Sequence, residues 1–176
     1  MRWLRRTPSP QSLPDDVRSR LDLDRHERVL AAALLDDGGW VVTSSVALLV
    51  AHGGSGAVVR GPWHEVAEAT WEPETREVAV RWATPGEPAL LLRLGDAPGR
   101  VPEVLRERVM STYVLSQRVP VRGRRGVTVA VRRNALDGSL LVQTVPDEGI
   151  DLRRPETAER VAAMARELGE QVGLRG

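Results

Sequence analysis

Histidines and a glycine-rich run are the places where this sequence could perform catalysis or bind a metal. His64 and Glu65 are neighbours in a run that predicts a strand, so their side chains should lie on opposite faces, and no second histidine completes a zinc motif. The run His52–Gly56 could form an oxyanion loop, but no Gly-x-Ser-x-Gly elbow accompanies it. A hydrolase would need Ser55 within hydrogen-bond reach of a histidine and a carboxylate. We therefore predict no catalytic residues, no cofactor and no metal site, and a protein that is not an enzyme.

A stretch of arginines is the second candidate for function. No acidic residue lies between Glu107 and Asp137, and six arginines there could contact an anion or a nucleic acid: Arg118, Arg122, Arg124, Arg125, Arg132 and Arg133. Guanidinium groups bind phosphate in a bidentate manner, so the stretch indicates an RNA- or phosphate-binding surface as one alternative. The stretch has no aromatic residue on which a base could stack, and acids of the last predicted helix could neutralise it. The other alternative is a solvated basic loop.

The composition narrows the classes of protein that remain. The 176-residue chain has no cysteine, which excludes disulfides and thiolate chemistry, and no lysine, which excludes Schiff-base chemistry and a P-loop. A net charge of +1 argues against strong polyanion binding, and no apolar run reaches the roughly 20 residues of a membrane span. Phenylalanine is absent, so we expect Trp40, Trp63, Trp71 and Trp82 to fill the core rather than to line a pocket.

Turn residues divide the first half of the chain into short strands. Seven runs are expected as strands, at residues 28–35, 40–44, 46–51, 57–60, 63–71, 76–83 and 89–94. The clearest turns between them are Asp36–Gly39 and Gly53–Gly56. Closely spaced strands with no helix between them predict an antiparallel barrel or sandwich.

Helical periodicity appears in three places. Residues 12–21 begin with a serine that could cap a short helix, residues 101–117 place apolar side chains at four-residue steps, and the residues after Pro155 carry a longer apolar stripe. Two alternating runs, at 127–132 and 140–145, predict a hairpin before the last helix. Residues 118–126 are expected to start extended and then to form a loop.

Seven antiparallel strands followed by one helix resemble a pleckstrin-homology-like (PH-like) domain, in which the helix closes one end of the barrel. Three segments carry the resemblance to the bacterial PH-like pattern: Glu27–Leu30, Val42–Val50 and Trp63–Val66. The segment Arg100–Val109 with Val114–Ser116 resembles a block in small uncharacterised actinomycete proteins. Ser45 and Val46 depart from the pattern, which has basic residues at that point.

The resemblance implies an α+β fold, namely a PH-like antiparallel seven-stranded barrel capped by a helix, with an appended β-hairpin and C-terminal helix. We expect a tail and short helix at 1–23, the barrel with its capping helix at 24–118, and a β-β-α extension at 119–176 packed on the barrel. Phosphoinositide-binding PH domains have a basic loop between their first two strands. Here the loop Asp36–Gly39 is acidic, so we expect no inositide at that position.

The function that we predict from the sequence is a non-enzymatic, cytoplasmic protein-interaction module. PH-like barrels offer an exposed sheet edge and a groove beside the helix, which suit a peptide, so the expected partner is another protein. Nucleic acid is the alternative partner, and no integral membrane association is expected. The first residues lack the apolar region of a secretory signal. Their three arginines beside Trp3 could touch an anionic membrane surface or form a solvated terminus.

Overall fold

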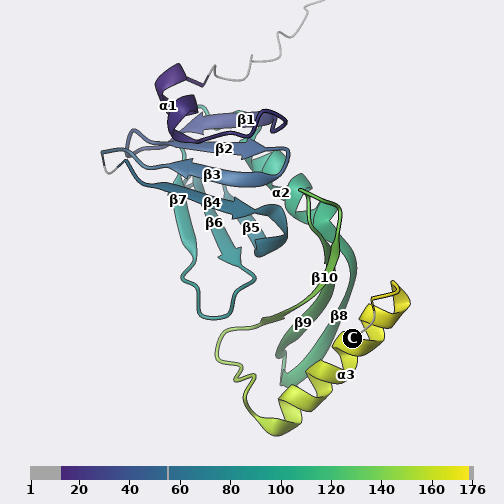
Figure 1. Ribbon diagram of the computed structural model, residues 1–176. Coiled ribbons are helices and arrows are strands. Elements are labelled where there is room, and N and C mark those ends of the chain that lie inside the picture. Colours follow the sequence, from purple (N-terminus) through teal and green to yellow (C-terminus); the bar gives the residue numbers. More distant parts are fainter. Residues whose placement is uncertain (1–12, 55, 175–176) are drawn as a thin grey trace, which may run out of the picture.

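Three antiparallel sheets and three α-helices make up the residues that the computed structural model describes, which are 13–54 and 56–174 (Figure 1). The first helix is α1 (Asp15–Arg20), and the expected cap, Ser12, lies outside the described residues. Its apolar side packs on the outer face of the first sheet, where Val17 and Leu21 are buried against Val42 and Leu49. Within the described residues, no helix is both long and apolar enough to cross a membrane.

The first sheet has four strands in chain order, and each neighbouring pair is antiparallel. Its strands are β1 (Val29–Leu34), β2 (Trp40–Ser44), β3 (Ala47–Ala51) and β4 (Val58–Pro62). The predicted hairpin turn at Asp36–Gly39 joins β1 and β2. Gly39 is required there because a Cβ atom at this position would lie 2.4 Å from the carbonyl oxygen of Ala51.

The second sheet has three strands, again in chain order. They are β5 (Val66–Glu72), β6 (Glu77–Trp82) and β7 (Leu90–Arg93). The strand predicted at 63–71 is wrong at its start, because Trp63–Glu65 form a single turn of 3₁₀ helix, η1, that leads into β5. The alternation predicted for the next strand is confirmed, since Val78 and Val80 are buried in the core.

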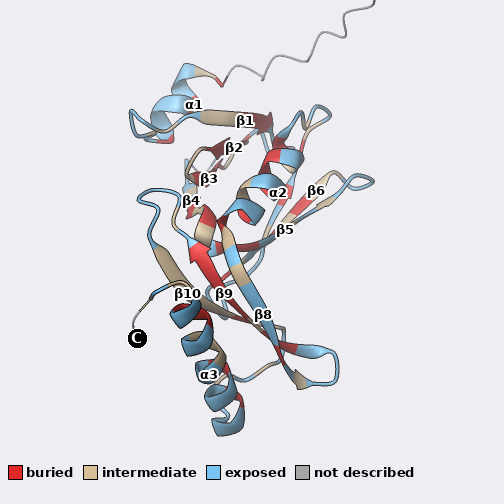
Figure 2. Cartoon of the chain, turned by 90° about the vertical axis from the view of Figure 1, so that its right-hand side faces the viewer, coloured by how far each residue is buried: buried red, intermediate tan, exposed pale blue. Residues whose placement is uncertain are grey.

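The main core lies between the first two sheets and the helix α2 (Val101–Thr112). Figure 2 shows the buried residues on the strands beside this helix, whose outer side is exposed. The seven strands do not form one closed barrel, because backbone pairing divides them into the two sheets, with a single bridge between Leu35 and Leu94. The sheets approach closely where Gly61 of β4 meets the ring of Trp82, since a Cβ atom on Gly61 would lie 2.4 Å from that ring.

The helix predicted at 101–117 is five residues too long. Leu105 and Val109 are buried as expected, but α2 ends at Thr112 and Tyr113 already has an extended backbone. The chain then continues directly into β8 (Tyr113–Arg122), in which Tyr113 pairs with Arg132. Pairing with a strand about twenty residues further along the chain therefore overrides the helical periodicity of these residues.

The third sheet joins β8 to β9 (Arg125–Arg133) and β10 (Leu140–Pro146), with β9 in the centre. Residues 118–126, expected to end in a loop, instead form the turn end of a tight hairpin between β8 and β9. The last helix, α3 (Pro155–Gln171), covers one face of this sheet, and Val161 and Leu168 pack on Val127, Val129 and Val131. The boundary predicted between 118 and 119 falls inside β8, so the extension is a three-stranded sheet with a helix.

Candidate functional site

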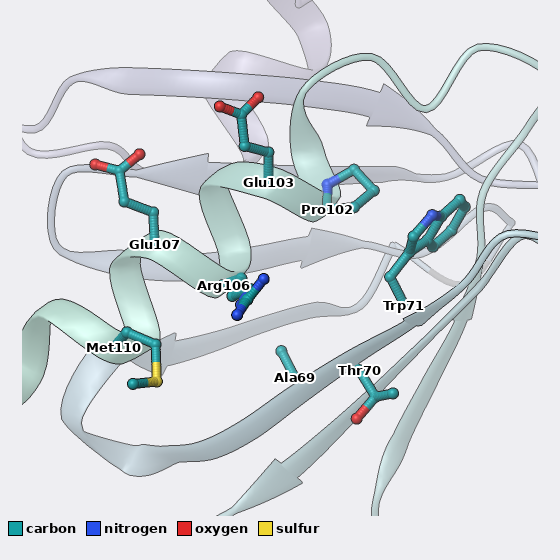
Figure 3. Close-up of a pocket in the computed structure, with 8 residues that line it drawn as sticks. All are labelled: Ala69, Thr70, Trp71, Pro102, Glu103, Arg106, Glu107 and Met110. Atoms are coloured by element: carbon teal, nitrogen blue, oxygen red, sulfur yellow. The ribbon is translucent and has the colours of Figure 1, made fainter.

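An open groove of about 790 Å³ runs between α2 and β5 (Figure 3). The helix positions one wall because its buried face, with Val101, Leu105 and Val109, is held in the main core. The opposite stripe then faces out at the spacing i, i+3, i+4, i+7 and contributes these groove residues: Glu103, Arg106, Glu107 and Met110. Pro102 in the first turn completes this wall.

Strand β5 forms the other wall of the groove with Ala69, Thr70 and Trp71. β5 is the outer strand of its sheet, so no strand of residues 13–54 or 56–174 pairs with its backbone on this side. At the beginning of the same strand, two side chains form hydrogen bonds to backbone carbonyl groups. The Tyr113 hydroxyl donates to the carbonyl of Ala67 at 2.8 Å, and Arg132 donates to that of Val66 at 2.9 Å. The open part of the strand therefore begins after these residues, beside α2.

The groove combines apolar surface with one guanidinium group that has no carboxylate partner. Glu103 is paired with Arg100 at 3.3 Å, and Glu107 is paired with Arg108 at 3.0 Å. Arg106 is exposed, and no carboxylate of the described residues lies within ion-pair distance of it. Figure 3 shows Arg106 on the helix side of the groove, and in this view it lies between Met110 and Trp71. Met110, on the same helix, is 61% exposed, which is unusual for a large apolar side chain.

The tryptophans divide between the core and this groove. Trp63 is buried, its indole N–H donates to the carbonyl of Ser44 at 3.0 Å, and Trp82 packs against the same core. Trp40 packs beside α1, on the outer face of the first sheet. Trp71 packs on the core with one side and lines the groove with the other. The periodicity of the sequence indicated the helix whose outer stripe forms one wall of the groove. It could not show which strand lies beside that stripe.

The six arginines of the predicted anion surface do not come together. Arg118 binds Asp147 with both of its terminal nitrogens and also donates to the carbonyl of Arg124 at 2.8 Å. Arg133 lies at the opposite end of β9 from Arg125 and donates to the carbonyl of Gly138 at 3.4 Å. Only Arg122, Arg124 and Arg125 share one surface, at the turn between β8 and β9.

Arg132 does not belong to that surface, because it is fully buried. Its guanidinium donates to the Thr112 hydroxyl at 2.8 Å and to the carbonyls of Trp63 and Val66, each at 2.9 Å. The ring of Tyr113 lies 3.9 Å from the guanidinium carbon. Burial lowers the pKa of Arg132, and Tyr113 acts in the opposite direction. The residue therefore joins the third sheet to the first half of the chain, and sequence reasoning missed this role.

The histidines show no arrangement for nucleophilic catalysis in the described part of the chain. His52 lies 3.4 Å from Asp37, but Ser55 is outside the described residues. His64 lies in the 3₁₀ turn η1, and not in a strand as predicted. Across residues 13–54 and 56–174, no group of three or more His, Cys, Asp or Glu side chains could hold a metal ion.

Comparison with known proteins gives no relative on which a function could be based. No family model, no curated protein and no solved structure matches the chain. Function must therefore be argued from the groove and from the arginine surface themselves.

Proposed function

We propose that this chain is a non-enzymatic protein-interaction module with a PH-like arrangement, which binds an extended peptide in the groove between α2 and β5. Support for the arrangement comes from the order of the elements, because a four-stranded sheet, a three-stranded sheet and a helix follow one another and share one core. The observation that carries the function is the open groove beside an outer strand, with Arg106 unpaired inside it. A cytoplasmic location stays a prediction from the sequence.

The chemistry of the groove favours a peptide with an acidic residue between two apolar ones. An extended peptide can add to the outer side of β5 through backbone hydrogen bonds, while its side chains alternate toward and away from the groove. Arg106 offers a guanidinium group for a carboxylate, and Trp71 and Met110 offer apolar contact on either side of it. Glu103 and Glu107 favour basic residues at the outer rim of the same peptide.

A non-enzymatic role agrees with the state of the groove's carboxylates. Glu103 and Glu107 are exposed and are each paired with an arginine, namely Arg100 just before the helix and Arg108 within it. A general acid or base is normally held in a desolvated environment, whereas both carboxylates on the outer side of α2 are exposed to solvent. The groove is thus suited to binding.

The alternative function, RNA or phosphate binding by the whole stretch Arg118–Arg133, has less support. One of its arginines is buried, one is bound to Asp147, and one lies at the far end of β9. A nucleic-acid strand contacts a continuous row of cations, and the dispersal of these six residues does not favour such a row.

A displayed peptide library selected on the full chain tests the proposed groove. We expect enriched peptides to share an acidic residue flanked by apolar residues. Arg106→Glu should weaken their binding by at least about ten-fold, because an attractive pair becomes a repulsive one. The same variant should select peptides with a basic residue at the central position.

The matched control is Arg93→Glu, which makes the same charge change at an exposed position on β7, away from the groove. This control should leave the selected sequences and their affinities unchanged. If Arg106→Glu and Met110→Ser bind the selected peptides as tightly as the unmodified chain, the groove is not the binding site and the proposal fails.

A further inference from the structure

The turn between β8 and β9 gathers three arginines in a small space. Arg122 and Arg125 are paired directly across the hairpin, and Gly123 and Arg124 form the two-residue turn between them. Gly123, the first of the two central residues, has a φ of +57°. A hairpin turn of this kind needs a positive φ at that position, and glycine adopts it without strain. An irregularity in β8 between Pro120 and Arg122 precedes the turn. Such bulges change the direction of the side chains that follow them.

This pairing of Arg122 with Arg125 is unfavourable unless something neutralises it. Residues directly opposite in an antiparallel pair lie on the same face, with Cβ atoms about 5 Å apart, and like charges at that spacing repel each other. No carboxylate of the described residues forms an ion pair with Arg122, Arg124 or Arg125. The nearby Asp147 is occupied by Arg118 and by the backbone N–H of Gly126 at 2.7 Å.

The same three arginines, together with Gly149 and Ile150, line a concavity with a volume of about 440 Å³. Arg125 is held in place because it donates to the carbonyl of Glu148 at 3.3 Å. Gly149, in the same loop, has a φ of +77°, a backbone conformation that favours glycine. Figures 1 and 2 show this turn at the end of β8 away from α2, so the surface is separate from the peptide groove.

We propose that this concavity binds a terminal phosphate group, that is, a phosphate monoester. Guanidinium groups match the oxygens of phosphate in a bidentate manner, and a monoester carries nearly two negative charges near neutral pH. Three cations without carboxylate partners suit such a dianion better than the single charge of a diester in a nucleic-acid backbone. Among the described residues no aromatic side chain lines the concavity, so these residues offer no platform on which a base could stack. This inference is independent of the peptide groove.

Calorimetric titration of the full chain at low ionic strength tests the site, with inorganic phosphate, methyl phosphate and dimethyl phosphate as probes. We expect inorganic phosphate and methyl phosphate to bind, and dimethyl phosphate to bind at least about ten-fold more weakly, because it carries only one charge. Vesicles of phosphatidylcholine that contain phosphatidic acid, compared with vesicles that contain phosphatidylglycerol, distinguish a lipid headgroup from a free phosphate as the source of the same chemistry.

Two variants locate the binding, and each has a second readout. Arg122→Gln and Arg125→Gln should each reduce phosphate affinity by about ten-fold, because each removes charge-assisted hydrogen bonds. Without phosphate, both variants should melt at or above the temperature of the unmodified chain, since the repulsion across the hairpin is relieved. Added phosphate should raise the melting temperature of the unmodified chain more than that of either variant.

Arg133→Gln is the matched control, because Arg133 is an exposed arginine at the other end of the same strand. It should leave phosphate affinity unchanged. Three results would each overturn the proposal: no binding of inorganic phosphate, equal binding of dimethyl phosphate and methyl phosphate, or an equal loss of affinity in Arg133→Gln and Arg125→Gln.

Discussion

Arg132 shows how one residue can have a role that its sequence neighbourhood conceals. It belongs to a run of arginines in which the others are on the surface, yet its guanidinium lies among buried carbonyl oxygens. A buried cation loses its hydration, and only well-placed acceptors offset that loss. Thr112 at the end of α2 and the carbonyls of Trp63 and Val66 are those acceptors. Because they belong to three different elements, the residue fixes the corner where α2, η1 and β5 meet the third sheet.

Replacement of Arg132 by methionine should lower the free energy of unfolding by about 3 kcal/mol, because two buried carbonyls lose their donor. Arg132→Lys should lose nearly as much, since one ammonium group cannot reproduce the planar set of donors. Urea denaturation measures both changes. Arg133→Met, at the exposed neighbouring position, should change the stability by less than about 0.5 kcal/mol. If the methionine variant is as stable as the unmodified chain, the free-energy cost of desolvating the Arg132 guanidinium cancels the stabilisation from its hydrogen bonds.

The third sheet is the element whose form differs most from the prediction. Its first strand begins directly after α2 with no loop, and its central strand β9 is buried between α3 and the rest of the molecule. Val127, Val129 and Val131 lie on one face of the strand, as their alternation predicted, and this face contacts α3. On the other side of the sheet, Val145 packs with Ala67 and Ala83 of the first half of the chain. The extension therefore has a core of its own and a smaller contact with the sheets before it.

Val129→Asp should destabilise this element by more than about 3 kcal/mol, because an unpaired charge would enter a fully buried position. We expect a lower melting temperature by circular dichroism and earlier proteolytic cleavage in residues 113–174 than in the first two sheets. Ser116→Asp, exposed on β8 of the same sheet, is the control and should have little effect. An unchanged melting temperature in Val129→Asp would mean that α3 does not pack on the sheet in solution.

Over the whole molecule, surface carboxylates link stability to pH. Hydrogen bonding from Arg118, together with the backbone N–H of Gly126, lowers the pKa of Asp147 against the effect of burial. Burial raises the pKa of Asp37, but hydrogen bonds from Gly39 and His52 outweigh it. Hydrogen bonds from the nearby Ser139 and Arg153 likewise lower the pKa values of Asp137 and Asp151. A carboxyl group whose pKa is lowered on folding stabilises the chain above its unfolded pKa, and this stabilisation is lost as the pH falls through the folded pKa.

The free energy of unfolding should therefore fall as the pH drops below the ordinary aspartate value of 3.8. Asp147→Asn should cost roughly 1 kcal/mol at about pH 7 and less at about pH 3, where the unmodified carboxylate is itself becoming protonated. Urea denaturation at both pH values measures the difference. Glu148→Gln, at an exposed neighbour, serves as the control. An equal cost of Asp147→Asn at both pH values would contradict a role for its charge.

The local elements of this protein could be predicted from its sequence alone. Alternation and turn residues placed the strands of the first two sheets to within a few residues, and the apolar stripe after Pro155 placed α3. These features depend on neighbours within one turn or one hairpin, so their signals are complete in a short window. The buried face of α2, with Leu105 and Val109, was predicted for the same reason.

The places where these elements meet, and therefore both candidate sites, depend on contacts between distant parts of the chain. The division of seven strands into two sheets, the early end of α2 at Thr112 and the burial of Arg132 all depend on partners far away in the chain. The groove exists because β5 lies beside the outer stripe of α2, and the phosphate concavity exists because the loop at Gly149 lies against the β8–β9 turn. Such contacts are set by the packing of whole sheets and helices, which a local pattern of residues does not encode.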